Sequence, residues 1–418
     1  MGLSNKNKTD IYWTFVFLGT AIGAGILFLP IQAGLGGVWV FLTSIVLILP
    51  ASYLSHKAFT QVILSQSTPM DFTGVVKHYF GSRFTAVLNI LFFITMFLLL
   101  IIFTIGLNND LGCYLKLLGL TKSNLSQTYY FSFLILLVLL AFFKLGDKYL
   151  IKFIGILSLI LSVLLLFVSF YLIPLWNLSI FKTLSLDQGF LKNFLEVYPL
   201  VVSSFIFFPA ISSMTIKYRT SKNNNSIDID KKIYKVILWA ISLLGIFFIF
   251  FTLSCMFALD SKNLQLASQN NVSCLVAITY RHKAKILTQI GPLISVFALV
   301  TSFFGLMLGA RSSAHELIQD YLKKDYQANS VGNNNSRIDT IILLIFLVVL
   351  WLIAISNISI IHVIGILITP LGAFFLYILP VYIFFKVPSL KKYRKMINII
   401  VMFLGILALC SYVLSFFV

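Results

Sequence analysis

The chain has 418 residues, of which 59% are hydrophobic and only 11% are charged, and its formal net charge is +18. A mean hydropathy of +0.99 excludes an ordinary soluble domain. The basic residues lie in short loops between apolar runs, so they indicate membrane topology and contact with the lipid bilayer, and no nucleic-acid partner is expected. We therefore expect an all-α polytopic membrane protein, with residues 1–418 forming a single transmembrane domain.

Apolar runs recur along the whole sequence, and each is long enough to cross a hydrocarbon core of about 30 Å. We expect eleven spans, covering residues 11–34, 37–56, 84–107, 128–145, 150–174, 196–216, 235–258, 287–310, 338–356, 360–385 and 396–417. Most of the 31 basic residues fall in segments on the same side as the N-terminus. The positive-inside rule thus predicts a cytoplasmic N-terminus and a C-terminus on the opposite side.

The first expected span is interrupted near its middle. Gly19, Gly23 and Gly25 weaken a helix there, and Pro30 removes a backbone donor shortly afterwards. A helix broken inside a membrane exposes N–H and C=O groups that lipid cannot satisfy. A neighbouring helix, water, or a bound solute and ion must satisfy them instead. The stretch is therefore a candidate transport site.

The sixth expected span repeats this interruption. Pro199 and Pro209 flank the residues Ser203-Ser204-Phe205-Ile206-Phe207-Phe208. Five spans separate the two interruptions, so the two helices run in opposite directions. This spacing indicates a five-plus-five inverted repeat: repeat one at about 11–174, repeat two at about 196–385, and an extra helix at about 396–417. The alternative is two proline kinks with unrelated causes, since Gly and Pro are common in membrane helices.

The stretch from Gly19 to Gly34, GTAIGAGILFLPIQAG, closely resembles the first helix of the hydroxy/aromatic amino acid permease family, in particular its serine/threonine branch. Further blocks agree in order: Pro209-Ala210-Ile211-Ser212-Ser213, Ser302-Phe303-Phe304-Gly305 with Leu308-Gly309-Ala310-Arg311, and Pro380-Val381-Tyr382. The resemblance implies a bacterial inner-membrane amino acid symporter of eleven helices. It also implies the inverted-repeat fold of the wider amino acid–polyamine–organocation transporters, with broken helices 1 and 6.

An amino acid substrate carries a carboxylate and an ammonium group. Free N–H groups at the break of the first span can hold the carboxylate, because a helix N-terminus carries a partial positive charge. Exposed carbonyls in both breaks can accept the ammonium, and the phenylalanines of the sixth span would face the substrate side chain. The predicted substrate-binding residues are Thr20, Gly23, Ala24, Gly25, Ser203, Ser204, Phe205 and Phe207. The alternative for the two serines is that they hydrogen-bond their own helix.

Sodium-coupled members of the wider fold hold the ion between the first and eighth spans. The matching positions are Gly19, Ile22, Ala298, Thr301 and Ser302, which makes Na⁺ a candidate coupling ion there, and no cofactor is expected. The serine/threonine branch often has a lysine where Thr301 stands, and this chain lacks it. The alternative is ordinary helix packing by small hydroxyl residues.

Proton coupling usually needs an ionisable group inside the membrane. No acidic or basic residue falls near the middle of an expected span, and Asp110 and Glu196 fall at span ends. The histidines, including His56 and His362, are expected in loops or near span ends as solvated or interfacial residues. We therefore favour sodium over protons as the coupling ion.

The segment before Pro209 is more apolar than in the serine/threonine branch, so threonine, another neutral amino acid or an aromatic one remains open as the substrate. The leading function is secondary active import of a neutral amino acid by cation symport. The alternatives are an aromatic amino acid permease of the same fold and a non-transporting amino acid sensor. An enzyme is not expected, because acids and histidines are scattered. Cys113 and Cys274 are expected as free thiols, with a disulfide as the alternative. The oligomeric state stays open.

Overall fold

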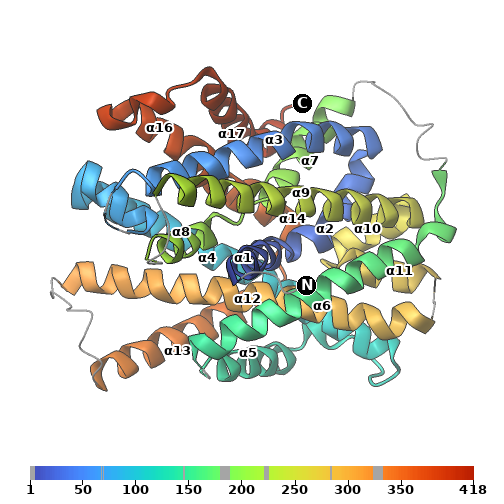
Figure 1. Ribbon diagram of the computed structural model, residues 1–418. Coiled ribbons are helices and arrows are strands. Elements are labelled where there is room, and N and C mark those ends of the chain that lie inside the picture. Colours follow the sequence, from blue (N-terminus) through green and yellow to red (C-terminus); the bar gives the residue numbers. More distant parts are fainter. Residues whose placement is uncertain are drawn as a thin grey trace.

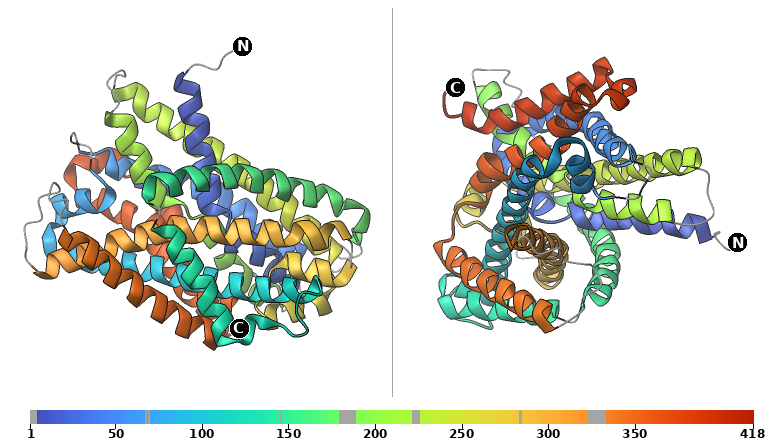
Figure 2. Two further views of the ribbon diagram at one scale, coloured as in Figure 1. Left: turned by 90° about the horizontal axis from the view of Figure 1, so that it is seen from below. Right: turned by 90° about the vertical axis from the view of Figure 1, so that its left-hand side faces the viewer.

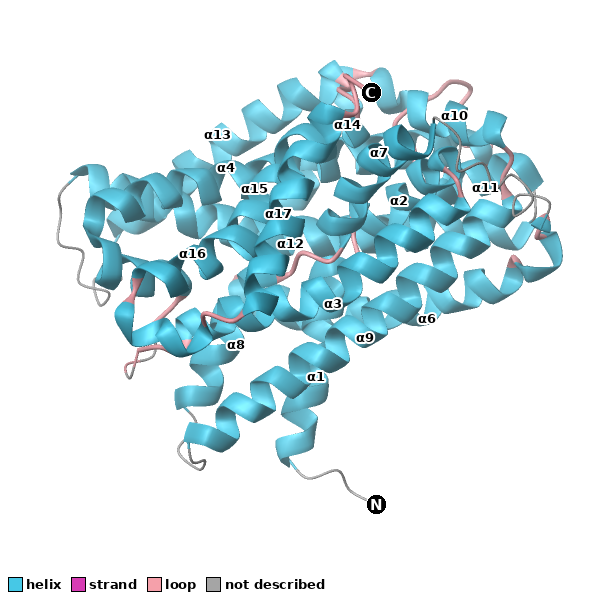
Figure 3. Ribbon diagram, turned by 90° about the horizontal axis from the view of Figure 1, so that it is seen from above, coloured by secondary structure: helices cyan, strands magenta, loops and turns pink. Residues whose placement is uncertain are grey.

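The chain folds as a bundle of long helices. The computed structural model describes residues 5–66, 68, 70–144, 146–178, 189–220, 226–282, 285–322 and 333–418 (Figure 1). The helices are α1 (Asn5–Ala21), α2 (Ala24–Gly36), α3 (Val38–Ile63), α4 (Phe72–Leu117), α5 (Tyr129–Phe143), α6 (Asp147–Tyr171), α7 (Gly189–Ser204), α8 (Phe208–Thr220), α9 (Ser226–Ala258), α10 (Ser261–Gln269), α11 (Cys274–His282), α12 (Lys285–Leu322), α13 (Asn333–Ser356), α14 (Ile360–Val363), α15 (Thr369–Ala373), α16 (Leu379–Lys386) and α17 (Met396–Leu414). Among these described residues, helices are joined by turns and loops and no strand occurs (Figure 3).

The all-α polytopic class is confirmed. Within the described ranges, nine helices are long and apolar enough to cross a membrane, and ten if α1 and α2 are counted as one bent span. The apolar helix α5 has 15 residues, which is shorter than the roughly 20 that a straight crossing needs. The expected number of eleven spans would require α5 to cross as well, and it stays a prediction.

Several helices extend well beyond the expected spans. The third span was expected at 84–107, but α4 begins at Phe72, where Asp71 accepts the Gly74 N–H at 2.9 Å, and it continues to Leu117. Gly81 interrupts it with a φ of 80°. The stretches at 217–235 and 311–337, which separate expected spans, are in part helical, because α9 begins at Ser226 and α12 continues to Leu322. Apolar windows mark only the lipid-facing part of a helix, and polar turns outside the membrane prolong it.

The two interrupted spans lie against each other in opposite directions. α2, the second half of the first span, packs on α7, the first half of the sixth span, while α1 contacts α8. This pairing of unlike halves requires the two spans to be antiparallel. α12 packs along α4 and also contacts α6 and α1, so it lies inside the bundle (Figure 2).

The span from Ile360 to Lys386 is a helix with two wider turns. π-helical turns at Ile364–Ile368 and Phe374–Ile378 separate α14, α15 and α16. Pro370 and Pro380 each follow one of these turns closely, and a proline cannot donate a helical hydrogen bond. The Thr369 hydroxyl donates to the Pro199 carbonyl of α7 at 3.0 Å, which fixes this span beside the sixth.

Candidate functional site

The first span is broken at Ile22 and Gly23. α1 ends at Ala21, α2 begins at Ala24, and the two helix axes differ by 53°. The last amide of the first half is that of Ile22, which donates to Leu18, and the first intrahelical bond of α2 joins the Leu27 amide to the Gly23 carbonyl. The amides of the first turn of α2 therefore have no acceptor within their own helix. Unpaired amides at a helix N-terminus can bind an anion, because they are free to donate and lie at the positive end of the helix dipole.

The sixth span is broken over Phe205–Phe207. A short turn closes α7, with the Phe205 and Ile206 amides bound to the Val202 and Ser203 carbonyls at 3.1 and 3.2 Å. The Phe207 amide donates instead to Nε2 of His56 in α3, at 3.4 Å. An imidazole from a neighbouring helix therefore satisfies one of the donors that the break exposes.

His56 was expected near a span end as a solvated or interfacial residue, and that prediction was wrong. Its side chain is wholly buried, its ring stacks on Phe207 with centroids 3.9 Å apart, and its Nδ1 donates to the Ser52 carbonyl at 2.7 Å. The bond to Ser52 leaves Nε2 free to accept. The second span was expected to end at residue 56 because the charged Lys57 follows. α3 continues to Ile63, however, so His56 and Lys57 both lie within the helix.

The glycines of the first break lie directly against the sixth and eighth spans. A Cβ atom added at Gly25 would lie 2.8 Å from the Ser204 hydroxyl and 3.1 Å from the Ser204 Cα. One added at Gly23 would overlap the Ser302 hydroxyl of α12 and lie 2.8 Å from the ring of Phe103 in α4. The structure thus brings together three predicted elements, and it adds Phe103, which nothing in the sequence distinguished from the other phenylalanines.

Two of the residues matched to an ion site are joined directly. The Ser302 hydroxyl donates to the Ile22 carbonyl at 3.1 Å, across α12 and the first break. The Thr301 hydroxyl donates within α12, to the Phe297 carbonyl at 2.7 Å and to the Ala298 carbonyl at 3.2 Å. Gly19 lies against α6, where an added Cβ would overlap Ser158. Gly19 therefore allows close helix packing.

The other predicted side chains are occupied within the fold. Thr20 donates to the Val16 carbonyl, and Ser203 and Ser204 both donate to the Leu200 carbonyl, as the helix-bonding alternative expects. Phe205 packs on Phe248 of α9 with ring centroids 5.1 Å apart. Phe207 stacks on Phe17 of α1 at 4.8 Å as well as on His56. The free polar groups at this site are therefore mainly backbone amides and carbonyls.

The two acids expected at span ends lie within long helices. Asp110 is wholly buried in α4, seven residues before the end of that helix. Glu196 of α7 is half-buried and accepts from Gln32 of α2 at 3.1 Å. Cys113 and Cys274 are free thiols. In the part of the chain that the structure describes, no group of three His, Cys, Asp or Glu side chains could hold a metal ion.

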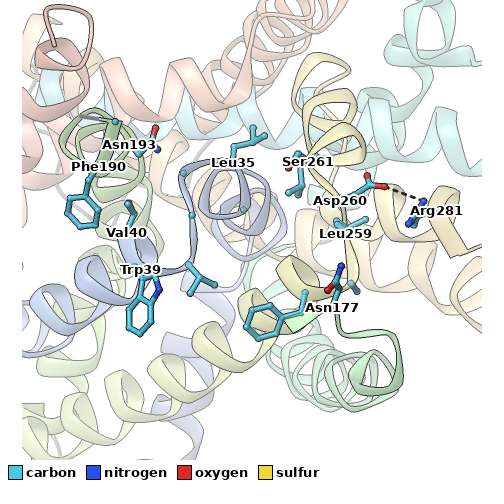
Figure 4. A pocket seen from close by; sticks show the side chains of 18 of the residues that line it. Leu35, Trp39, Val40, Asn177, Phe190, Asn193, Leu259, Asp260, Ser261 and Arg281 are labelled. Carbon is cyan, nitrogen blue, oxygen red and sulfur yellow. Dashed lines mark ion pairs between the residues drawn. The ribbon is translucent and has the colours of Figure 1, made fainter. Parts of the chain in front are cut away.

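A separate cavity of about 830 Å³ lies beside the C-terminal end of α2 (Figure 4). It is lined by the C-terminal end of α2, the start of α3 and the loops around α10 and α11, and it contains Asp260 paired with Arg281 at 3.2 Å. Hydrogen bonds from Asn263 hold the pKa of the exposed Asp260 carboxyl below its usual value. None of the predicted site residues lines this cavity, so it does not mark the central site.

The comparisons with known proteins point to transport. The serine transporter SdaC of Escherichia coli strain K12 is 29% identical over 98% of this chain and 95% of that protein. The inner membrane transport protein YqeG of the same strain is 30% identical over 96% of this chain and 97% of that protein. Among solved structures, Mhp1, a nucleobase-cation-symport-1 family transporter in a closed conformation with bromovinylhydantoin bound, superposes with a TM-score of 0.57 at 13% identity. The match covers 97% of this chain and 91% of Mhp1.

The likeness to Mhp1 shows the fold, and the sequence relatives extend over nearly the whole chain. These relatives are membrane transporters and not enzymes. The model of the tryptophan/tyrosine permease family matches residues 7–411, which includes both broken spans and α12. The expected relationship to the hydroxy/aromatic amino acid permeases is thereby confirmed, and the chain belongs to the tryptophan/tyrosine permease family.

Proposed function

We propose that this protein is a secondary active transporter that imports a neutral, serine- or threonine-like amino acid together with a cation. The observation that carries the proposal is the first break. There the N-terminal amides of α2 lie beside Ser204 of the sixth span and Ser302 of the eighth. A substrate carboxylate at the amides of Gly23, Ala24 and Gly25 would complete their hydrogen bonds and meet the positive end of the α2 dipole.

The ammonium group needs acceptors on the opposite side of the substrate. Carbonyls at the end of α1 and around Ser203 and Ser204 are the nearest candidates, since the serine hydroxyls themselves donate to Leu200. The relatives named serine transporters favour a small polar side chain. The family description and the apolar wall of Phe205 and Phe207 favour an aromatic amino acid as the second candidate. An amino acid sensor that does not transport remains the third.

The architecture that fits this function is the five-plus-five inverted repeat. The antiparallel pairing of α1 and α2 with α8 and α7 supports it, as does the shared fold with Mhp1. We propose repeats at about 11–174 and 196–385, the extra helix α17, and eleven crossings including α5. The protein would lie in a bacterial inner membrane, with its N-terminus in the cytoplasm and its C-terminus in the periplasm, because the basic residues favour that orientation.

Sodium is our candidate for the ion at the central site. Ile22 and Ser302 already share a hydrogen bond, and Thr301 and Ala298 lie within one turn of Ser302. Replacing Thr301 and Ser302 together by Ala removes two neutral side-chain oxygens. We expect the sodium concentration for half-maximal uptake to rise about tenfold, which corresponds to about 1.4 kcal/mol of lost binding. Uptake by proteoliposomes at varied NaCl concentration measures this value. An unchanged value in the double variant would show that Thr301 and Ser302 do not bind the coupling ion.

The experiment that tests the function is thermal unfolding of the purified protein in detergent with each of the twenty amino acids, in NaCl and in KCl. A ligand that binds only the folded protein raises the unfolding midpoint, by an amount set by its concentration relative to its dissociation constant. A shift with serine or threonine that is larger in NaCl is the expected result. A shift with tryptophan or tyrosine would select the aromatic alternative. No shift with any amino acid would overturn the proposal.

A further inference from the structure

A carboxyl group outside the central site is buried with one oxygen unsatisfied. Asp110 of α4 has no exposed surface, and its Oδ1 accepts the backbone N–H of Ser273 at 2.9 Å. Its Oδ2 is also buried, and no hydrogen-bond partner for it occurs among the described residues. Ser273 immediately precedes α11, so this carboxyl joins α4 to the hairpin that α10 and α11 form.

Hydroxyl groups from α4, from α12 and from Ser273 at the start of α11 surround Asp110. The Ser273 hydroxyl lies 3.3 Å from that of Ser295 in α12, and the Ser295 hydroxyl is near both Asp110 and Tyr114. The Tyr114 hydroxyl, one turn further along α4, is also buried without a partner, and a Cβ at Gly291 of α12 would lie 2.8 Å from it. The site is therefore small, polar and enclosed by α4, α11 and α12.

No positive side chain in the described ranges compensates a charge on Asp110. Asp110 takes part in none of their ion pairs, and the groups that act on it directly are the hydroxyls and the amide already named. The titratable neighbours are Cys113 and Tyr114 of α4 and Cys274 of α11, with Cys255 of α9 beside Cys274. α12 contributes Ser295.

A carboxylate buried without a cation loses its hydration and recovers little of it. Only part of that loss is returned by the Ser273 N–H, by the nearby Ser273 and Ser295 hydroxyls, and by the partial positive charge at the start of the nine-residue helix α11. The closed arrangement therefore favours the protonated form.

An asparagine clasp, formed by Asn109, Asn271 and Asn357, holds the hairpin against α4. The Asn109 amide donates to the Asn271 carbonyl at 3.2 Å and to the Asn357 side chain at 2.8 Å. Asn271 in turn accepts the Ile360 amide at 3.0 Å, which ties the hairpin to the span that begins with α14. Asn271 and Asn357 have φ values of 50° and 45°, a conformation that asparagine tolerates better than most residues. These bonds hold the residues just before Ser273 against α4, beside Asp110.

We propose that Asp110 is a proton-binding site that the α10–α11 hairpin closes. When the hairpin closes, the carboxylate takes one proton from water to become the neutral acid. When the hairpin lifts, the acid is hydrated and returns the proton. Acidic conditions on the hairpin side of the membrane, the periplasm in the orientation proposed above, thus stabilise the closed form. Protonation of Asp110 stands on this geometry alone, whereas its link to uptake rests on the proposed function.

The direct test is infrared spectroscopy of the purified protein at about pH 7, where hydrated carboxyls are ionised. We expect the carbonyl stretch of a protonated carboxylic acid in the natural protein, its loss in Asp110→Asn, and its retention in Asp260→Asn. Asp260 is the matched control because it lies beside the same hairpin but is exposed and paired with Arg281. Absence of a band that depends on Asp110 would overturn the proposal. Loss of the band on adding NaCl would also overturn it, in favour of a metal cation.

A second variant leaves Asp110 in place. Asn357→Ala removes the side-chain oxygen that accepts from Asn109 and from Asn271, so the hairpin should open more often and the Asp110 band should weaken. An undiminished band in Asn357→Ala would show that the clasp does not control protonation. This comparison also serves if Asp110→Asn fails to fold.

The link to uptake is tested in proteoliposomes with a variable pH on the hairpin side. The rate for the natural protein should change by up to about tenfold per pH unit, the limit for one linked proton, and Asp110→Asn should be nearly independent of pH. A pH-independent natural protein whose midpoint still shifts with an amino acid would overturn the link and leave the proposed function intact. An infrared band that depends on Asp110, in a protein whose unfolding midpoint shifts with no amino acid, would support the proton site and overturn the proposed function.

Discussion

Gly23→Leu should abolish amino acid uptake while the protein still inserts into the membrane. Any Cβ at this position would overlap the Ser302 hydroxyl and press on Phe103, so a leucine side chain would fill the space between the first break and α12. It would also cover the amides that are proposed to hold the substrate carboxylate. The loss should exceed about a hundredfold in uptake rate, because an interaction that positions a charged substrate is worth several kcal/mol. Uptake of radiolabelled serine or threonine by cells, normalised to membrane-inserted protein, measures it.

The matched control is Gly305→Leu in α12. Gly305 is exposed and no atom lies within 4 Å of an added Cβ, so the same substitution there should insert and transport normally. Binding is followed separately, by the amino acid-induced shift in the unfolding midpoint, which Gly23→Leu should lose and Gly305→Leu should keep. Normal uptake by Gly23→Leu would show that the first break is not part of the substrate site.

Replacing His56 by Ala should destabilise the protein by about 2–5 kcal/mol. The change leaves a cavity where a wholly buried ring stacked on Phe207, and it leaves the Phe207 amide without its acceptor. His56→Phe keeps an aromatic ring but removes both the acceptor for the Phe207 amide and the donor to the Ser52 carbonyl, so it should lose about 1–3 kcal/mol. Both variants should reduce uptake, because the break in the sixth span is no longer fixed to α3. Chemical unfolding in detergent and uptake by proteoliposomes measure the two effects.

His362→Ala is the control for these variants, because His362 lies at the start of the tenth span and is exposed. It should change the free energy of unfolding by less than about 0.5 kcal/mol. If His56→Phe matched the natural protein in both stability and uptake, the imidazole would not be the anchor of the sixth-span break.

Local sequence predicted the broken helices well. Gly23 and Gly25 allow the chain to leave the helix and let other spans approach closely, and the interruption at Phe205–Phe207 falls between Pro199 and Pro209. These are backbone preferences and steric effects of the residues themselves, so they need no knowledge of distant neighbours. The same local pattern carried the family resemblance, which the family match over residues 7–411 confirmed.

The burial of His56 and the burial of Asp110 have a common cause. Both residues were placed at span ends because hydropathy falls there, at Lys57 and just beyond residue 107. Hydropathy reports whether a window can face lipid, and it does not report what other helices cover. α3 continues past His56, and the α10–α11 hairpin lies over the end of α4, so both polar side chains are buried by segments far away in the sequence.

The sequence by itself determined that this chain is a helical membrane transporter of its family, and where its first and sixth spans are interrupted. Composition, apolar length and the special backbone properties of Gly and Pro are enough for that. Only the tertiary structure decided which groups satisfy the interrupted backbone. The Phe207 amide bonds to His56 of α3, the Ile22 carbonyl to Ser302 of α12, and Asp110 to the start of α11. A hydrogen bond between two helices forms only if the donor and acceptor lie within a few tenths of an ångström of their ideal separation. The packing of the whole bundle sets that separation.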